Sequence, residues 1–287
     1  MEWITQLPTH NVWVTTSGLL LGLIIGSFLN VVIGRFPVML QRQWQQECAN
    51  LTGTELTAQE PYNLAVPRSQ CPQCQQPIAW YDNIPVISWL SLKARCRHCH
   101  MPITIRYPFI ELATGIIFAL IAWYCGGTVT ALAYGWLASL LIVLFFIDLD
   151  HMLLPDQLNY LVLWSGLALA WAGYSVPLAD AVLGAMLGYG SLWIVFWAYK
   201  LLTGKDGMGY GDFKLLAAFG AWHGAQLLPV TVVVAAVCGA VIGVIWQRAK
   251  QSHGQPIPFG PFLIIGGTIT LLWGNQLLGM YINWVLR

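Results

Sequence analysis

The chain has 287 residues, of which 57% are hydrophobic and only 9% are charged. A soluble globular domain carries about 25% charged residues, so this composition argues against that class and favours an integral membrane protein. The formal net charge of +1 excludes little by itself, because the positions of the charges along the chain matter more than their sum.

Apolar stretches long enough to cross a bilayer recur along the chain. They predict an all-α integral membrane protein with about eight transmembrane helices. The candidate spans are 14–34, 107–124, 129–147, 157–175, 180–202, 212–228, 229–247 and 259–281. The sixth is short and carries His223. No Lys or Arg precedes Arg35, so the basic region of a cleaved signal peptide is missing and we expect the first span to be retained.

The basic residues predict the orientation of the spans, because Lys and Arg accumulate on the inner side of a membrane. With the N-terminus outside, the inside segments are 35–106, 148–156, 203–211 and 248–258. Every Lys and Arg except Arg287 then falls in these segments or at the span ends beside them. We therefore predict three parts, namely an outer N-terminus with the first helix (1–34), an inner loop domain (35–106) and a multi-span membrane domain (107–287).

The inner loop holds two Cys-x-x-Cys pairs, CPQC and CRHC, after a polar stretch (41–60) that we expect to be mobile. Two such pairs at this separation predict a four-thiolate structural zinc site, although iron would fit the same ligands. The predicted ligands are Cys71, Cys74, Cys96 and Cys99. The alternative is two disulfides, which a reducing cytosol disfavours.

Two neighbouring histidines, His98 and His100, are expected to be bystanders, because four thiolates already complete a tetrahedral site. Zinc-bound loops also occur in nucleic-acid-binding proteins. Here Lys93, Arg95 and Arg97 are too few for a basic surface, so no nucleic-acid partner is expected.

A first group of carboxylates follows the third span, in FFIDLDHMLLPD. Asp148 lies near the C-terminal end of its span, where the helix dipole and the apolar surroundings both disfavour a negative charge. Asp150 has more access to water and is compatible with a solvated loop charge. Asp156 lies beside Pro155 at a helix start, where a carboxylate is a good cap.

A second group is the stretch GMGYGDFKLL, in which Asp212 begins the sixth span. As a capping residue Asp212 would be unremarkable, but capping leaves Gly207, Gly209 and Gly211 unexplained. Glycines allow a close approach of backbone, which suits a site where an extended peptide must reach the acid.

If Asp148 and Asp212 meet, they can share one proton. One carboxylate then activates a water and the other protonates a peptide carbonyl, as in aspartic proteases. Two alternatives remain at this point, a transporter or proton relay with intramembrane acids and a scaffold of capped helices. A transporter predicts acids near mid-span and an internal repeat, neither of which is visible here.

Five motifs together resemble those of the bacterial type IV prepilin peptidases, which are membrane aspartic proteases of the Gly-x-Gly-Asp type. The resemblance covers nearly the whole chain. In family order the motifs are GSFLNVVIGRFP (26–37), NIPVISWLSLKARCRHC (83–99), IRYPFIELATG (105–115), IDLDHMLLPD (147–156) and GYGDFKLL (209–216). One departure is Ala94, where many relatives have Gly.

The resemblance implies a function in two steps. The substrates would be type IV prepilins and type II secretion pseudopilins, whose basic leader is cut after a glycine at the cytosolic face of the bacterial inner membrane. The new N-terminal residue would then be N-methylated from S-adenosylmethionine. No motif locates the binding site of this methyl donor.

The resemblance also assigns residues. Asp148 and Asp212 match the two catalytic aspartates, and the four cysteines match the zinc ligands. Gly209, Gly211, Asp150 and Asp156 match supporting positions. The lipid bilayer is the expected environment, with a periplasmic N-terminus.

Overall fold

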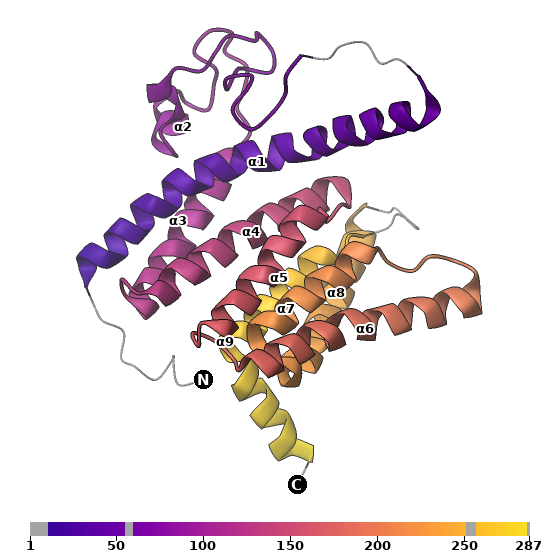
Figure 1. Cartoon of the computed structure of the whole chain (residues 1–287). Coiled ribbons are helices and arrows are strands. Elements are labelled where there is room, and N and C mark those ends of the chain that lie inside the picture. Colours follow the sequence, from indigo (N-terminus) through magenta and orange to yellow (C-terminus); the bar gives the residue numbers. More distant parts are fainter. Residues whose placement is uncertain (1–10, 55–59, 251–256, 286–287) are drawn as a thin grey trace. The chain divides into compact units, whose positions relative to one another are not determined.

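The computed structural model describes residues 11–54, 60–250 and 257–285, and these residues are helical apart from connecting loops (Figure 1). The α-helices are α1 (Val12–Thr52), α2 (Ile87–Ser91), α3 (Arg106–Cys125), α4 (Val129–His151), α5 (Asp156–Trp171), α6 (Leu178–Thr203), α7 (Tyr210–His223), α8 (Leu228–Lys250) and α9 (Gly260–Val285). Two short 3₁₀ turns, η1 (Trp80–Asn83) and η2 (Ala225–Leu227), complete the elements. Within the described residues there is no β-strand, which confirms the predicted all-α class.

Six of these helices are long and apolar enough to cross a membrane, so the chain is a multi-pass membrane protein. They are α1, α3, α4, α6, α8 with the η2 turn before it, and α9. Helices α5 and α7 occupy the fourth and sixth predicted spans but have only 16 and 14 residues. A helix needs about 20 residues to cross the hydrocarbon core. The predicted total of about eight is reached when these two shorter helices are included.

Helix α1 is much longer than the predicted first span, because it continues from Val12 to Thr52 through Pro37. The expectation of a mobile segment over 41–60 is wrong for residues 41–52, which are helical; residues 55–59 lie outside the described part of the chain. The Gln-rich sequence there is polar but favours a helix. Gly53, with φ of 66°, ends the helix in a left-handed C-cap.

The chain divides into two compact units, an N-terminal unit (4–143) and a C-terminal unit (144–287). In the N-terminal unit α1 and α3 approach closely along glycines spaced four residues apart. A Cβ atom on Gly18, Gly22 or Gly26 would lie within 2.8 Å of atoms of α3. Small residues at this spacing let two membrane helices pack backbone against backbone, which explains the glycine of the GSFLN motif.

In the C-terminal unit the short helix α7 is the buried centre, and α5, α6 and α9 pack around it (Figure 1). Each neighbour approaches through a glycine. Gly166 of α5 meets Trp222, Gly184 of α6 meets the backbone of Gly220, and Gly267 of α9 meets the ring of Phe219. Nearly all of α7 is therefore removed from solvent, and a carboxylate at its start is held in a rigid frame.

Candidate active site and metal site

Asp212 lies in the first turn of α7, three residues after the N-cap residue Gly209. Its carboxylate accepts a hydrogen bond from the backbone N–H of Gly209, which satisfies one of the free amide groups at the helix start. The alternative in which Asp212 is itself the N-cap residue is therefore wrong. Only 7% of Asp212 is exposed, so the carboxylate is far more buried than a surface helix cap requires.

Asp148 lies in the last turn of α4 and is 5% exposed. Its carboxylate accepts a hydrogen bond from the backbone N–H of Gly260, at the start of α9. A negative charge at the C-terminal end of α4 is disfavoured by the dipole of its own helix, whereas the first turn of α9 offers partial positive charge. The start of α9 thus compensates for the unfavourable position of Asp148 on α4.

The two aspartates come together around Leu154, which lies in the connection between α4 and α5. A Cβ atom on Gly211 would lie 2.7 Å from Leu154 Cβ, and a Cβ atom on Gly260 would lie 3.0 Å from Leu154 Cδ1. The charge of Asp148 also acts directly on Asp212. The structure therefore places both predicted carboxylates in one buried cluster, built from α4, α7 and α9.

The glycines before Asp212 serve mainly the packing of the chain itself. A Cβ atom on Gly207 would lie 2.8 Å from the ring of Tyr199, and one on Gly211 would meet Leu154. The prediction that this spacing admits a substrate peptide therefore does not apply to these two positions. Gly209 differs, since a Cβ atom there would meet nothing closer than Asp212 Oδ2 at 3.8 Å.

The other two acids of the first motif are both exposed. Asp150 is exposed in the last turn of α4. The N-cap residue of α5 is Pro155 and Asp156 is the first helical residue, so Asp156 does not occupy the N-cap position itself. Instead Asp156 forms an ion pair of 2.6 Å with Lys214 of α7, which ties the starts of α5 and α7 together.

The four cysteines of the loop lie on two turns that repeat the same hydrogen bonds. In the first turn Cys71 N–H bonds Gln76 O and Gln75 N–H bonds Cys71 O, and in the second Cys96 and His100 make the matching bonds. Gln75 and His100 share the left-handed backbone that such a turn needs, with φ of 55° and 56°. The sulfur atoms of the four cysteines lie within 4.8 Å of one another. Together they can hold a metal ion, with Cys71, Cys74, Cys96 and Cys99 as its ligands.

The backbone of these turns favours thiolates. The N–H groups of Cys74 and Gln73 point at the Cys71 sulfur and lower the pKa of that thiol to about 6. The N–H groups of Cys99 and His98 similarly lower the pKa of Cys96. Burial and the neighbouring cysteines instead raise the pKa of Cys99 to about 11, because four thiolates this close repel one another unless a cation lies between them.

A buried carboxylate, Glu111 of α3, connects the cysteine loop to the helices of the N-terminal unit. Its Oε2 accepts the backbone N–H of Val86 at 2.8 Å, and the hydroxyl of Ser27 on α1 bonds the same carboxylate. Val86 has a φ of 60°, a strained backbone for a β-branched residue. Sequence reasoning included Glu111 only within the IRYPFIELATG motif and assigned it no role.

Comparison with known proteins shows the family to which the chain belongs. Residues 20–125 match the Bacterial Peptidase A24 N-terminal domain, and residues 135–244 match the Type IV leader peptidase family. A prepilin leader peptidase/N-methyltransferase of Aeromonas salmonicida is 50% identical over 277 residues, which cover 93% of each chain. The chain belongs to the type IV leader peptidase family.

Other family members are similar over the same length. A prepilin leader peptidase/N-methyltransferase of Pseudomonas putida is 46% identical over 274 residues, covering 95% of each chain. One of Pseudomonas aeruginosa is 46% identical over 285 residues, covering 99% of this chain and 98% of the relative. No solved structure matches the chain. The resemblance inferred from the five motifs is thus confirmed.

Two residues near Asp148 and Asp212 were missed by sequence reasoning. One is Gly260, in the stretch PFGPF, where a glycine between two prolines is the only local signal. The other is Asn159 of α5, which is fully buried and donates from its amide to the carbonyl of Leu154 at 3.4 Å. Gly260 and Asn159 both lie against Leu154. In the sequence, neither residue is marked by a charge or by the spacing of a motif.

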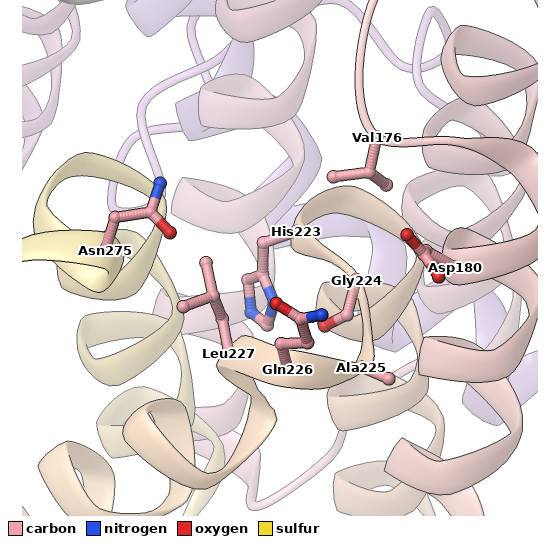
Figure 2. Close-up of a pocket in the computed structure, with 8 residues that line it drawn as sticks. All are labelled: Val176, Asp180, His223, Gly224, Ala225, Gln226, Leu227 and Asn275. Carbon is pink, nitrogen blue, oxygen red and sulfur yellow. The ribbon is translucent and has the colours of Figure 1, made fainter. Parts of the chain in front are cut away.

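A separate pocket of about 170 Å³ lies at the other end of α7, around His223 and Gln226 (Figure 2). His223 is buried, and its two ring nitrogens contact Thr231 Oγ1 at 3.0 Å and Gly224 O at 3.2 Å. At 1.5 Å per residue the helix separates it from Asp212 by roughly 16 Å. This pocket is therefore distinct from the carboxylate cluster.

Proposed function

We propose that the chain removes the basic leader of type IV prepilins and type II secretion pseudopilins, cutting after a glycine. The observation that carries this proposal is the buried pair Asp148 and Asp212, held in one cluster in a member of the type IV leader peptidase family. The names of the relatives, prepilin leader peptidase/N-methyltransferase, supply the substrate class and a second activity.

In the proposed mechanism Asp148 and Asp212 share one proton, because two carboxylates this close cannot both be charged at low cost. The ionised carboxylate takes a proton from a water as the water oxygen attacks the scissile carbonyl carbon. The protonated carboxylate gives its proton to the carbonyl oxygen, which forms a neutral tetrahedral diol. Transfer of a proton to the leaving amine then breaks the C–N bond.

The remaining predicted residues act around this pair. Gly209 provides the N–H that holds Asp212 and leaves open space beside it, where an extended substrate can approach. Gly211 lets α7 approach Leu154. Asp156 fixes the start of α5 through Lys214, and exposed Asp150 adds negative charge near the pair. These four residues support the reaction without taking part in it.

The proposed location is the bacterial inner membrane, with a periplasmic N-terminus and the active site at the cytosolic face. The distribution of Lys and Arg supports this orientation. It places the carboxylate pair where the membrane helix of a prepilin meets its cytosolic leader. The scissile bond and the two acids then lie at the same membrane depth.

The second proposed step is N-methylation of the new N-terminal residue. S-adenosylmethionine would supply the methyl group, and the pilin amine would accept it; none of the described residues is assigned to the methyl donor. Zn²⁺ in the cysteine cluster would neutralise the thiolates and hold the two turns together as a structural ion. With all four ligand positions taken by Cys, the ion has no open position for substrate.

Mass spectrometry of the reaction products tests the proposed function. The purified full-length protein in detergent is mixed with a prepilin, with or without S-adenosylmethionine. We expect loss of the leader after its last glycine in both cases, and the added mass of one methyl group only with the methyl donor. A prepilin whose leader glycine is replaced serves as the matched substrate and should stay intact. An uncut wild-type prepilin would contradict the proposal.

A further inference from the structure

In the first turn of α9, one backbone N–H group makes no hydrogen bond within the helix and points at the carboxylate cluster. Helix α9 begins at Gly260, within the sequence PFGPF. Pro261 has no N–H, and the N–H groups of Phe262 and Leu263 both bond to Phe259 O, at 3.0 and 3.1 Å. This leaves the N–H of Gly260, and it donates to the Asp148 carboxylate.

Position 260 also has no room for a side chain. A Cβ atom there would lie 2.5 Å from Asp148 Oδ2 and 3.0 Å from Leu154 Cδ1. Real Cβ atoms do not approach a carboxylate oxygen so closely, so a side chain would displace Asp148 or the start of α9. The hydrogen bond and the absence of a Cβ atom are two independent constraints on the same carboxylate.

We propose that Gly260 is a positioning residue for hydrolysis, which holds the Asp148 carboxylate toward Asp212 through its backbone N–H. Helix α9 is then the third structural component of the active site, beside the ends of α4 and α7. This inference rests on the proposed function, because it assumes that Asp148 and Asp212 act as a pair.

Leu154 makes the placement of α9 and α7 mutually dependent. Its side chain fills the space against both Gly260 and Gly211, and its carbonyl accepts the buried amide of Asn159. A shift of the α9 start would therefore move Leu154 against the GYGD stretch. The carboxylates need their relative placement within a fraction of an ångström for proton sharing, so the geometry is sensitive to this contact.

The first test compares Gly260→Ala with Gly279→Ala in the full-length protein. Gly279 lies in the same helix, and a Cβ atom there meets nothing within 4 Å. We expect Gly260→Ala to lower kcat for prepilin cleavage by roughly 100-fold at unchanged KM, as for a misplaced catalytic group. Its methylation of a pre-cut pilin should match that of Gly279→Ala, whereas its thermal unfolding midpoint should be lower, because the added Cβ atom is crowded against Asp148 and Leu154.

A second variant replaces the N–H group by an oxygen atom and adds no side chain. Cell-free synthesis with glycolic acid in place of Gly260 changes one backbone amide to an ester and creates no steric clash. It is the deciding variant if Gly260→Ala unfolds or loses methylation. We again expect a lower kcat at unchanged KM. A glycolate protein with the kcat of the wild type would overturn the proposal.

The inference and the proposed function fail in different ways. If Asp148→Asn and Asp212→Asn still cleave, the aspartate pair itself is wrong. If both lose cleavage while the Gly260 variants keep it, only the positioning role of Gly260 is wrong.

Discussion

The cysteine cluster and the carboxylate cluster are assembled in opposite ways. The four cysteines come from two successive turns of one loop, and each turn repeats the hydrogen bonds of the other. The two aspartates come from the end of α4 and the start of α7, and one of them is held by the start of α9. The first site is local and modular, whereas the second exists only when distant helices are packed.

This difference determines what each site tolerates. A turn that presents two sulfurs keeps its shape when the rest of the unit moves, so the metal supplies the missing connection between the turns. The carboxylates have no such connection and depend on close contacts around Leu154. We therefore expect the cysteine loop to lose its structure when the ion is removed. The carboxylate site should instead lose activity when its helices are displaced by small distances.

The largest expected effect is on metal content. Replacing both Cys71 and Cys74 by Ser removes one complete turn of ligands, so zinc should fall from about one ion per chain to none. Elemental analysis of the purified protein measures this, and Cys125→Ser, which changes a cysteine outside the cluster, is the control. Full zinc content in the double variant would show that the cluster does not hold the ion.

A smaller effect is expected for Glu111, which joins the local loop to the packed helices. Glu111→Ala leaves the N–H of Val86 without its acceptor, which should cost about 1–3 kcal/mol of local stability. Glu111→Gln keeps an acceptor oxygen and is the matched control. Hydrogen exchange at the Val86 amide should become faster in the Ala variant than in the Gln variant. Equal protection in both would show that the loop is held by other contacts.

The smallest effect is expected at Ala94, which occupies a left-handed backbone with φ of 58°. Gly adopts this conformation without strain, so Ala94→Gly should stabilise the cysteine loop by about 1 kcal/mol. The control is Ala79→Gly, because Ala79 has an ordinary extended backbone with φ of −67°. Resistance of bound zinc to a chelator measures the difference, and a gain for Ala79→Gly alone would contradict this account.

The sequence predicted most of the helices because membrane spans are recorded directly in apolar runs. It missed the continuation of α1 to Thr52, since hydropathy does not detect a polar segment with high helix propensity. It overestimated α7, which ends at His223 because the chain turns at Gly224, where φ is 80°.

The cysteine cluster was equally predictable, because its ligand spacing is a local property. The importance of Asp148 was suggested by its unfavourable position, that of Asp212 by the glycines before it, and both by the family motifs, but their proximity required the packed structure. Gly260 could not be identified from the sequence, because its significance is a contact with a residue on another helix.

We propose that Asp148 and Asp212 form one hydrolytic site that methylation does not use. The most direct measurement follows cleavage of a prepilin and methylation of a pre-cut pilin by Asp148→Asn and Asp212→Asn. The control is Asp180→Asn, in the first turn of α6, which lines the separate pocket around His223. The Asp148 and Asp212 variants should both lose cleavage but still methylate the pre-cut pilin, while the control should do both. Cleavage by either variant at the wild-type rate would contradict it.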